Sequence, residues 1–106
     1  MQPIDFRNET WADIQSRMSS ERERVYNALK RHGDATTRAL AAAMNEDIVN
    51  VRPRVTELCQ LGAVEVVGRS GRHEGVYRAR TIGDWTAWFT QQQHVALHGD
   101  QLLLGI

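Results

Sequence analysis

The spacing of the apolar residues changes at Gly62, and this change limits what the chain can fold into. Before Gly62, over residues 50–61, apolar residues recur at helical spacing. After it, residues 63–67 are rich in valine and roughly alternate, and residues 76–80 alternate more clearly, which predicts two strands. Residues 68–75 between them include three glycines, so we expect a hairpin loop there.

The helix before Gly62 is expected to turn Val51, Val55 and Leu58 inward, because they recur at i, i+4 and i+7. Pro53 lies close to its start. Proline is tolerated in the first turn of a helix, where its missing N–H is not needed, so we expect Pro53 to set the start at about residue 50. Gly62 is expected to end the helix.

Two further helices are predicted upstream. Ser20 and Glu23 have the spacing of a capping box, which indicates a helix start. Thr36 is expected to cap a second helix over residues 37–44, and Asn45 to follow it, since asparagine tolerates the left-handed conformation.

Both flanks of this central region are predicted to be helical. In the N-terminal flank, Asn8 or Thr10 is the expected cap of a short helix, and in the C-terminal flank Asp84 is the expected cap of a helix that runs to about residue 98. Apolar stripes on these helices either pack into the core or form a homodimer interface, and aromatic residues suit both. The favoured interpretation is a dimer, with the interface on Trp11, Ile14, Trp85, Trp88 and Phe89.

Length and composition indicate an ordinary globular chain. Its 106 residues are enough for one small domain that buries a core without disulfides. No stretch approaches the ~20 apolar residues of a transmembrane helix, and residues 1–5 do not look like a secretory leader. The only cysteine, Cys59, is compatible with a reducing compartment. We therefore expect a cytoplasmic protein with no membrane partner.

The formal net charge is zero, with 13 basic and 13 acidic residues, but the charge is unevenly distributed. Residues 48–80 carry six arginines and three acidic residues, whereas residues 1–47 carry seven positive and eight negative charges and residues 81–106 only two negative charges. The chain is therefore not a strongly basic nucleic-acid binder as a whole. Its basic excess lies on the predicted helix over residues 50–61 and on the hairpin.

The order helix, helix, tight turn, helix, hairpin resembles a winged helix-turn-helix domain over residues 21–80, similar to small MarR-like and phage-borne regulators. The segments that carry the resemblance are residues 36–41, 51–58, 61–65, 71–72 and 76–78. The resemblance implies a mainly α fold with a small β-hairpin wing. The flanks resemble no known family, and their apolar spacing predicts helical extensions at both ends. The chain is thus expected to divide into an N-terminal arm (1–19), the winged domain (20–80) and a C-terminal aromatic helix (81–106).

The resemblance also implies that the third helix enters the major groove of double-stranded DNA. A helix fits that groove, and arginine reads guanine well there. The candidates on this helix are Asn50, Arg52, Pro53, Arg54 and Thr56. The alternative is a solvated helix face, with Glu57 neutralising one of the arginines.

The wing is expected to contact the DNA backbone or the minor groove, which attracts arginine where it is narrow. Its candidates are Arg69, Ser70, Arg72 and His73. Thr37 and Arg38, at the start of the second central helix, are candidates for phosphate contacts.

Other chemistry is weakly supported. His94 and His98 have metal-ligand spacing, but no convincing third ligand is near and Asp100 is a weak one, so no metal is predicted. No catalytic residue, cofactor or small-molecule ligand is indicated, and Cys59 is expected to be a partly buried thiol.

The leading hypothesis is thus a homodimeric, sequence-specific transcriptional regulator, expected to repress, that binds double-stranded DNA without catalysis. The twelve-to-one ratio of arginine to lysine suggests a bacterial or phage source. The alternatives are a winged-helix module that binds proteins, and a phage replication or recombination accessory that binds DNA without regulating transcription.

Overall fold

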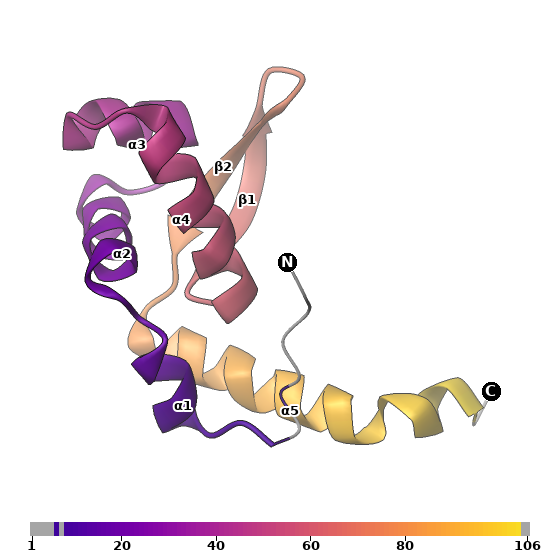
Figure 1. Cartoon of the computed structure of the whole chain (residues 1–106). Helices are drawn as coiled ribbons and strands as arrows, with labels where there is room; N and C mark the ends of the chain where they lie inside the picture. Colours follow the sequence, from indigo (N-terminus) through magenta and orange to yellow (C-terminus); the bar gives the residue numbers. More distant parts are fainter. Residues whose placement is uncertain (1–5, 7, 105–106) are drawn as a thin grey trace.

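A computed structural model describes residue 6 and residues 8–104, with side chains described as far as residue 96. Five helices and one hairpin follow in the order expected from the sequence (Figure 1). The elements are α1 (Trp11–Ser16), α2 (Ser20–His32), α3 (Thr37–Met44), α4 (Ile48–Leu61), β1 (Val64–Ser70), β2 (Glu74–Ala79) and α5 (Ile82–Leu104).

The central core forms where α2, α3 and α4 pack together. Leu29, Leu40 and Leu58, one from each helix, are at most 1% exposed. The turns between these helices follow from local chemistry: the Thr36 hydroxyl accepts the amide of Ala39, as expected for the cap of α3. The expected left-handed residue at the end of α3 is confirmed at Asn45, with φ 55°.

The connector between α2 and α3 joins the hairpin. Ala35 and Tyr77 exchange backbone hydrogen bonds of 3.0 and 2.8 Å, so the connector adds one bridge beside β2. This bridge fixes the base of the hairpin next to the start of α3. As a result, the first residues of α3 and the hairpin lie side by side.

Two predicted helix caps were displaced, by one and by three residues. The cap of α2 is Ser19, whose hydroxyl accepts the Arg22 amide, and not Ser20. The cap of α5 is supplied by Thr81, whose hydroxyl accepts the amide of Asp84, so Asp84 lies in the first turn and is not the cap. In α1 the expected cap at Thr10 is confirmed, with a reciprocal bond from Asp13. Two adjacent candidate caps cannot be separated from sequence alone.

The start of α4 also differs from the prediction. Asp47 caps it by accepting the Val49 amide at 3.1 Å, so the helix begins at Ile48 and not near residue 50. Pro53 is therefore the sixth residue of the helix and lies beyond the first turn. A proline there removes one backbone hydrogen bond. The helix continues through it, with Val51 and Val55 on either side buried in the core.

The hairpin is longer and its turn shorter than the composition suggested. The strands pair from Val64 and Ala79 up to Ser70 and Glu74, which leaves only residues 71–73 in the turn. A bulge between Val66 and Gly68 shifts the register. Strand pairing uses backbone groups, so a polar, glycine-rich sequence can still form strands when its partner strand is in place.

The aromatic residues of the flanks pack against one another inside one chain. Ile14, Trp85 and Phe89 are 0%, 2% and 3% exposed, and the Trp11 and Trp85 rings meet edge to face at 5.0 Å. Trp88 is partly buried against the same cluster. Of the two alternatives, packing into the core of one chain describes this stripe. Ile14, Trp85 and Phe89 are too deeply buried to contact a second copy.

The first turns of α5 are attached to the end of α4. The Trp85 indole donates to the Leu61 carbonyl at 2.8 Å, and Trp88 lies so close to Gly62 that a Cβ there would be 2.1 Å from its ring. Gly62 also has φ 82°, which confirms it as the left-handed end of α4. Farther along, the α5 ribbon extends well past the rest of the molecule (Figure 1).

Candidate nucleic-acid interface

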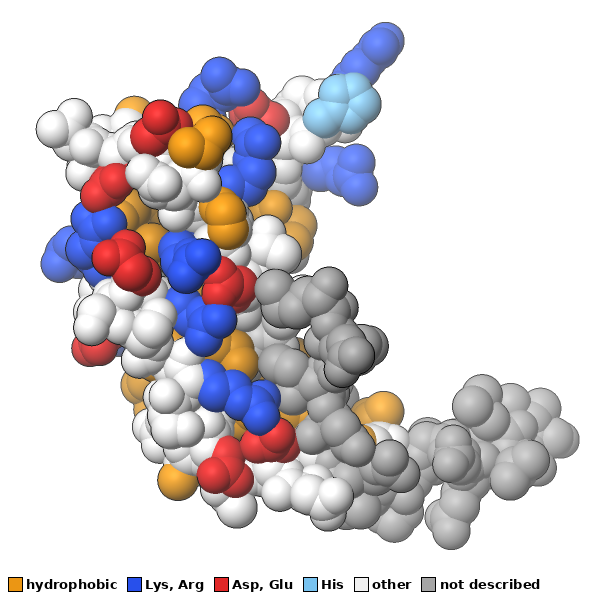
Figure 2. All heavy atoms as spheres, viewed as in Figure 1, with side chains coloured by type: hydrophobic (Ala, Val, Ile, Leu, Met, Phe, Trp, Pro, Cys, Tyr) orange, Lys and Arg blue, Asp and Glu red, His pale blue; other side chains and the backbone are white. Residues whose placement is uncertain are grey.

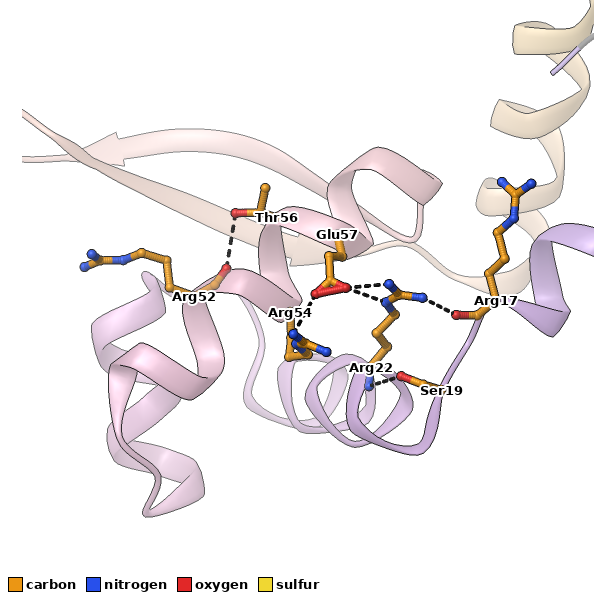
Figure 3. Close-up of polar contacts among 7 residues, drawn as sticks. All are labelled: Arg17, Ser19, Arg22, Arg52, Arg54, Thr56 and Glu57. Atoms are coloured by element: carbon orange, nitrogen blue, oxygen red, sulfur yellow. Dashed lines mark hydrogen bonds and ion pairs between the residues drawn. The ribbon is translucent and has the colours of Figure 1, made fainter. Parts of the chain in front are cut away.

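The two arginines predicted to read bases lie on different sides of α4. Successive helical residues are about 100° apart, so residues 52 and 54 are separated by about 200°. Arg52 and Thr56 lie on the side that faces the hairpin, whereas Arg54 faces α2 (Figure 3). The two sides of α4 are called here the wing side and the α2 side.

The wing side forms one wall of a groove of about 450 Å³ between α4, the start of α3 and the hairpin. Five of the predicted DNA-binding residues line it: Thr37, Arg38, Arg52, Thr56 and His73. Glu74, Gly75 and Tyr77 complete the lining. Residues separated by up to 40 positions in the sequence are thus gathered in one concave surface.

Three arginines on or beside this groove have no carboxylate partner in the part of the chain that the structure describes. Arg52, Arg69 and Arg72 are exposed, and no ion pair within that part includes them. Ser70 and His73 are also exposed, and basic side chains gather around the end of the hairpin (Figure 2). Flexible cations held in solvent beside a groove are suited to contact phosphate.

The other three arginines of residues 48–80 are each paired with a carboxylate. Arg54 pairs with Glu57 at 3.0 Å, Arg78 with Asp34 at 2.8 Å, and Arg80 with Glu65 at 3.1 Å. The basic excess that the sequence places on this segment is therefore carried by the arginines of the hairpin end and by Arg52.

The α2 side of α4 is organised around one buried carboxylate. Glu57 is 8% exposed and accepts two hydrogen bonds from Arg22, at 2.9 and 2.5 Å (Figure 3). Arg22 also donates to the carbonyl of Arg17 at 2.6 Å, which connects the end of α1 to α2 and α4. The expected alternative, in which Glu57 neutralises one of the two arginines of this helix, agrees with the ion pair between Glu57 and Arg54. We call Glu57, Arg22 and Arg54 the triad.

Asn50 and Pro53 are exposed, and with Arg54 they line a second hollow that has balanced charge. Its other charged residues are Arg24, Glu21 and Glu46. Arg24 pairs with Glu46 at 2.7 Å and with Glu21 at 3.3 Å, and both carboxylates, Glu46 first, raise the pKa of Arg24. The cations of this hollow are therefore already neutralised within the chain.

Asp34 and Cys59 have pKa values that are shifted for different reasons. Arg78 forms a two-pronged hydrogen bond to Asp34 and lowers the pKa of that carboxyl. Burial raises the pKa of the Cys59 thiol to about 11, and the charge of Arg80 opposes this only in part. Cys59 is thus a protonated thiol at neutral pH, which is a poor nucleophile.

The residues with described side chains include no group of three or more His, Cys, Asp or Glu that could hold a metal ion. The side chains of His98 and Asp100 lie outside the described residues, so the predicted histidine pair cannot be placed. None of the helices in the described part of the chain is long and apolar enough to cross a membrane.

Sequence reasoning missed two contacts that shape this interface. Glu74 holds Arg38 across the groove at 3.0 Å, and Arg22 reaches Glu57 from a helix 35 residues earlier. Neither pair has a local spacing signal. The hairpin register, in which Ser70 pairs with Glu74, is what places Glu74 beside the groove. A loop predicted over residues 68–75 leaves Glu74 without a paired residue.

A search of solved structures finds a similar fold in a homodimeric winged helix-turn-helix DNA-binding domain from Mycobacterium bovis, fragment 1–100 of a possible ArsR-family transcriptional regulator, determined by NMR. The TM-score is 0.54 at 21% sequence identity, over 83% of this chain and 79% of that one. The fold is a winged helix-turn-helix. In it α3 and α4 form the helix-turn-helix and β1 and β2 the wing, so the predicted mainly α fold with a small hairpin is confirmed. No protein-family model and no curated protein matches this chain.

Proposed function

We propose that this chain is a sequence-specific double-stranded-DNA-binding protein that represses transcription by occupying a promoter. The observation that carries the proposal is the groove between α4 and the wing, where Arg52 lies opposite a hairpin that bears Arg69 and Arg72. A major groove accepts a helix of this size, and the planar guanidinium of Arg52 can grip guanine with two hydrogen bonds. The similar M. bovis domain is described as a DNA-binding domain, which supports DNA as the ligand.

The proposed roles follow from exposure and pairing. Arg52 and Thr56 read bases, with Asn50 and Pro53 on the adjoining exposed surface of α4. The wing residues Arg69, Ser70, Arg72 and His73 contact the backbone or enter the minor groove. Thr37 contacts a phosphate at the start of α3, and Arg38 lies beside it with its guanidinium paired to Glu74. Arg54 is not proposed as a base reader, because its charge is paired with Glu57, the same carboxylate that binds Arg22 of α2.

We also propose that the protein acts as a homodimer, because the similar domain is described as homodimeric. Two copies of α4 about one DNA turn apart would read a palindromic site. We place the contact on α5, where Val95 is 46% exposed. The buried aromatic residues at the root of α5 then stabilise each copy and do not join the two.

Selection from a random duplex pool tests the DNA proposal. The full chain is equilibrated with the pool at several salt concentrations, and the retained duplexes are sequenced. We expect an enriched palindromic motif and an affinity that falls steeply with salt, since each phosphate contact releases counterions. No retention at about 50 mM salt, where phosphate contacts are strong, would reject DNA binding and favour a protein-interaction module.

A reporter assay then separates regulation from other uses of DNA. A promoter that contains the enriched motif should lose activity when the wild-type chain is present and keep it with Arg52→Ala. Binding without any change in reporter output would support the accessory role in replication or recombination.

A further inference from the structure

The wing-side groove contains one carboxylate among its lining residues, and that carboxylate is Glu74. It is the first residue of β2 and pairs in register with Ser70, so the hairpin holds it at a defined place. From there it accepts a hydrogen bond from Nε of Arg38 at 3.0 Å. The wing and the start of α3 are thus joined across the groove by an ion pair.

The Arg38–Glu74 pair has little to contribute to folding. The Arg38 side chain is 74% exposed and that of Glu74 is 39% exposed, and pairs in such surroundings add little stability because water competes with them. Their effect on an approaching anion is different. A phosphate that enters the groove meets a carboxylate, and it finds the guanidinium of Arg38 already engaged.

We propose that Glu74 limits the affinity of the groove for phosphate by holding Arg38, and so lowers binding to any duplex regardless of sequence. The inference rests on the proposed DNA binding. Sequence-independent affinity comes mainly from cations that displace counterions at phosphates. Keeping one cation occupied leaves the recognition of a site to groups such as Arg52, and reduces the occupancy of the many competing sites in a genome.

Removing the carboxylate should release Arg38 for one more phosphate contact. Glu74→Gln keeps the size of the side chain and its place in the hairpin. We expect it to bind the selected duplex and a scrambled duplex of equal length several-fold more tightly than wild type, with a salt slope steeper by about 0.9. Arg38→Ala should remove most of this gain, because the gain arises from the freed guanidinium.

The measurement is equilibrium binding of the full chain to both duplexes between about 50 and 200 mM salt. The variants are Glu74→Gln, Arg38→Ala and the double variant, with thermal melting to show that each is folded. Glu23→Gln is the matched control: it makes the same change in net charge at an exposed residue of α2 that does not line the groove.

The outcomes separate the two proposals. If wild type binds but Glu74→Gln is no tighter than Glu23→Gln, the restraint by Glu74 is wrong and DNA binding stands. An equal gain from Glu74→Gln with and without Arg38 would also overturn it, since the effect would then be one of general charge. If neither wild type nor Glu74→Gln binds either duplex, both proposals fail.

Discussion

Each side of α4 carries an arginine, but only the one on the α2 side is held in an ion pair within the described part of the chain. On the wing side, Arg52 is exposed and has no carboxylate partner among the described residues, beside a hairpin with two more such arginines. On the α2 side, Arg54 shares the nearly buried Glu57 with Arg22. One arginine is available to a ligand and the other is part of the structure. Charge counted along the sequence therefore overstates the cations that this helix can offer to DNA.

The comparison also separates two uses of charge in one helix. The triad attaches α4 to α2 and to the end of α1, which fixes the direction in which the wing side points. Binding surfaces need exposed groups, and exposed groups do little to hold a helix in place. Dividing the two tasks between opposite sides of α4 satisfies both requirements.

The largest effect is expected from Glu57→Ala, on stability. Removal of this carboxylate leaves Arg22 and Arg54 crowded without their partner, and breaking a buried ion pair on one side costs several kcal/mol. Since both arginines keep some contact with solvent, we expect a loss of about 3 kcal/mol, the lower end of that range. Urea unfolding measures it. A loss no larger than that of Glu23→Ala would show that the triad does not support α4.

Arg52→Ala should reveal the difference between the sides in DNA binding. Loss of a two-pronged contact to guanine is expected to weaken binding to the selected duplex by roughly 1–3 kcal/mol and to relax preference at one base pair. Arg54→Ala is the matched variant on the α2 side, and it should change affinity much less. If the two variants weaken binding equally, the distinction between the sides fails for DNA recognition.

A smaller effect is expected from the wing. Arg72→Ala should weaken the selected and the scrambled duplex alike and reduce the salt slope by about 0.9, the value for one phosphate contact. Titrations at several salt concentrations measure the slope. A loss confined to the selected duplex would instead mean that Arg72 reads bases.

The smallest effect is expected from the exposed pair of Asp34 and Arg78, in contrast to the triad around the buried Glu57. Arg78 lowers the pKa of Asp34, so this carboxylate stabilises the fold above its unfolded pKa, and the contribution is lost as the pH falls through the lower folded pKa. Asp34→Asn should therefore melt slightly below wild type at pH 7, and the two should converge as the pH falls below the lowered folded pKa of Asp34. A constant difference across this range would exclude ionisation as its cause.

Much of the fold could be predicted from the sequence, because the order of helices and strands is written in local periodicity. The change of period at Gly62 located the end of α4 and the start of the hairpin, and glycine was required there by both φ and the approach of Trp88. Helix starts were less accurate, since Ser19 and Ser20 are chemically equivalent as caps.

The interface was predictable only in part. The inward face of Val51, Val55 and Leu58 implies that residues 52 and 54 point to different sides. What lies on each side depends on tertiary contacts, as with Arg22, which reaches Glu57 from another helix. The location of the dimer surface was hard to predict for the same reason. Periodicity identifies an apolar stripe, but whether its own chain or a second copy covers it depends on how the helices pack.

The attachment of α5 to the end of α4 has a geometric consequence. Because Trp85 is hydrogen-bonded to Leu61 and Trp88 packs on Gly62, the start of α5 lies directly against the end of α4. In the proposed dimer, α5 would then determine how far apart the two copies of α4 lie. The distance between two copies of α4 would be set by the length of α5 and its angle to α4, so half-site spacing would be built into a single helix.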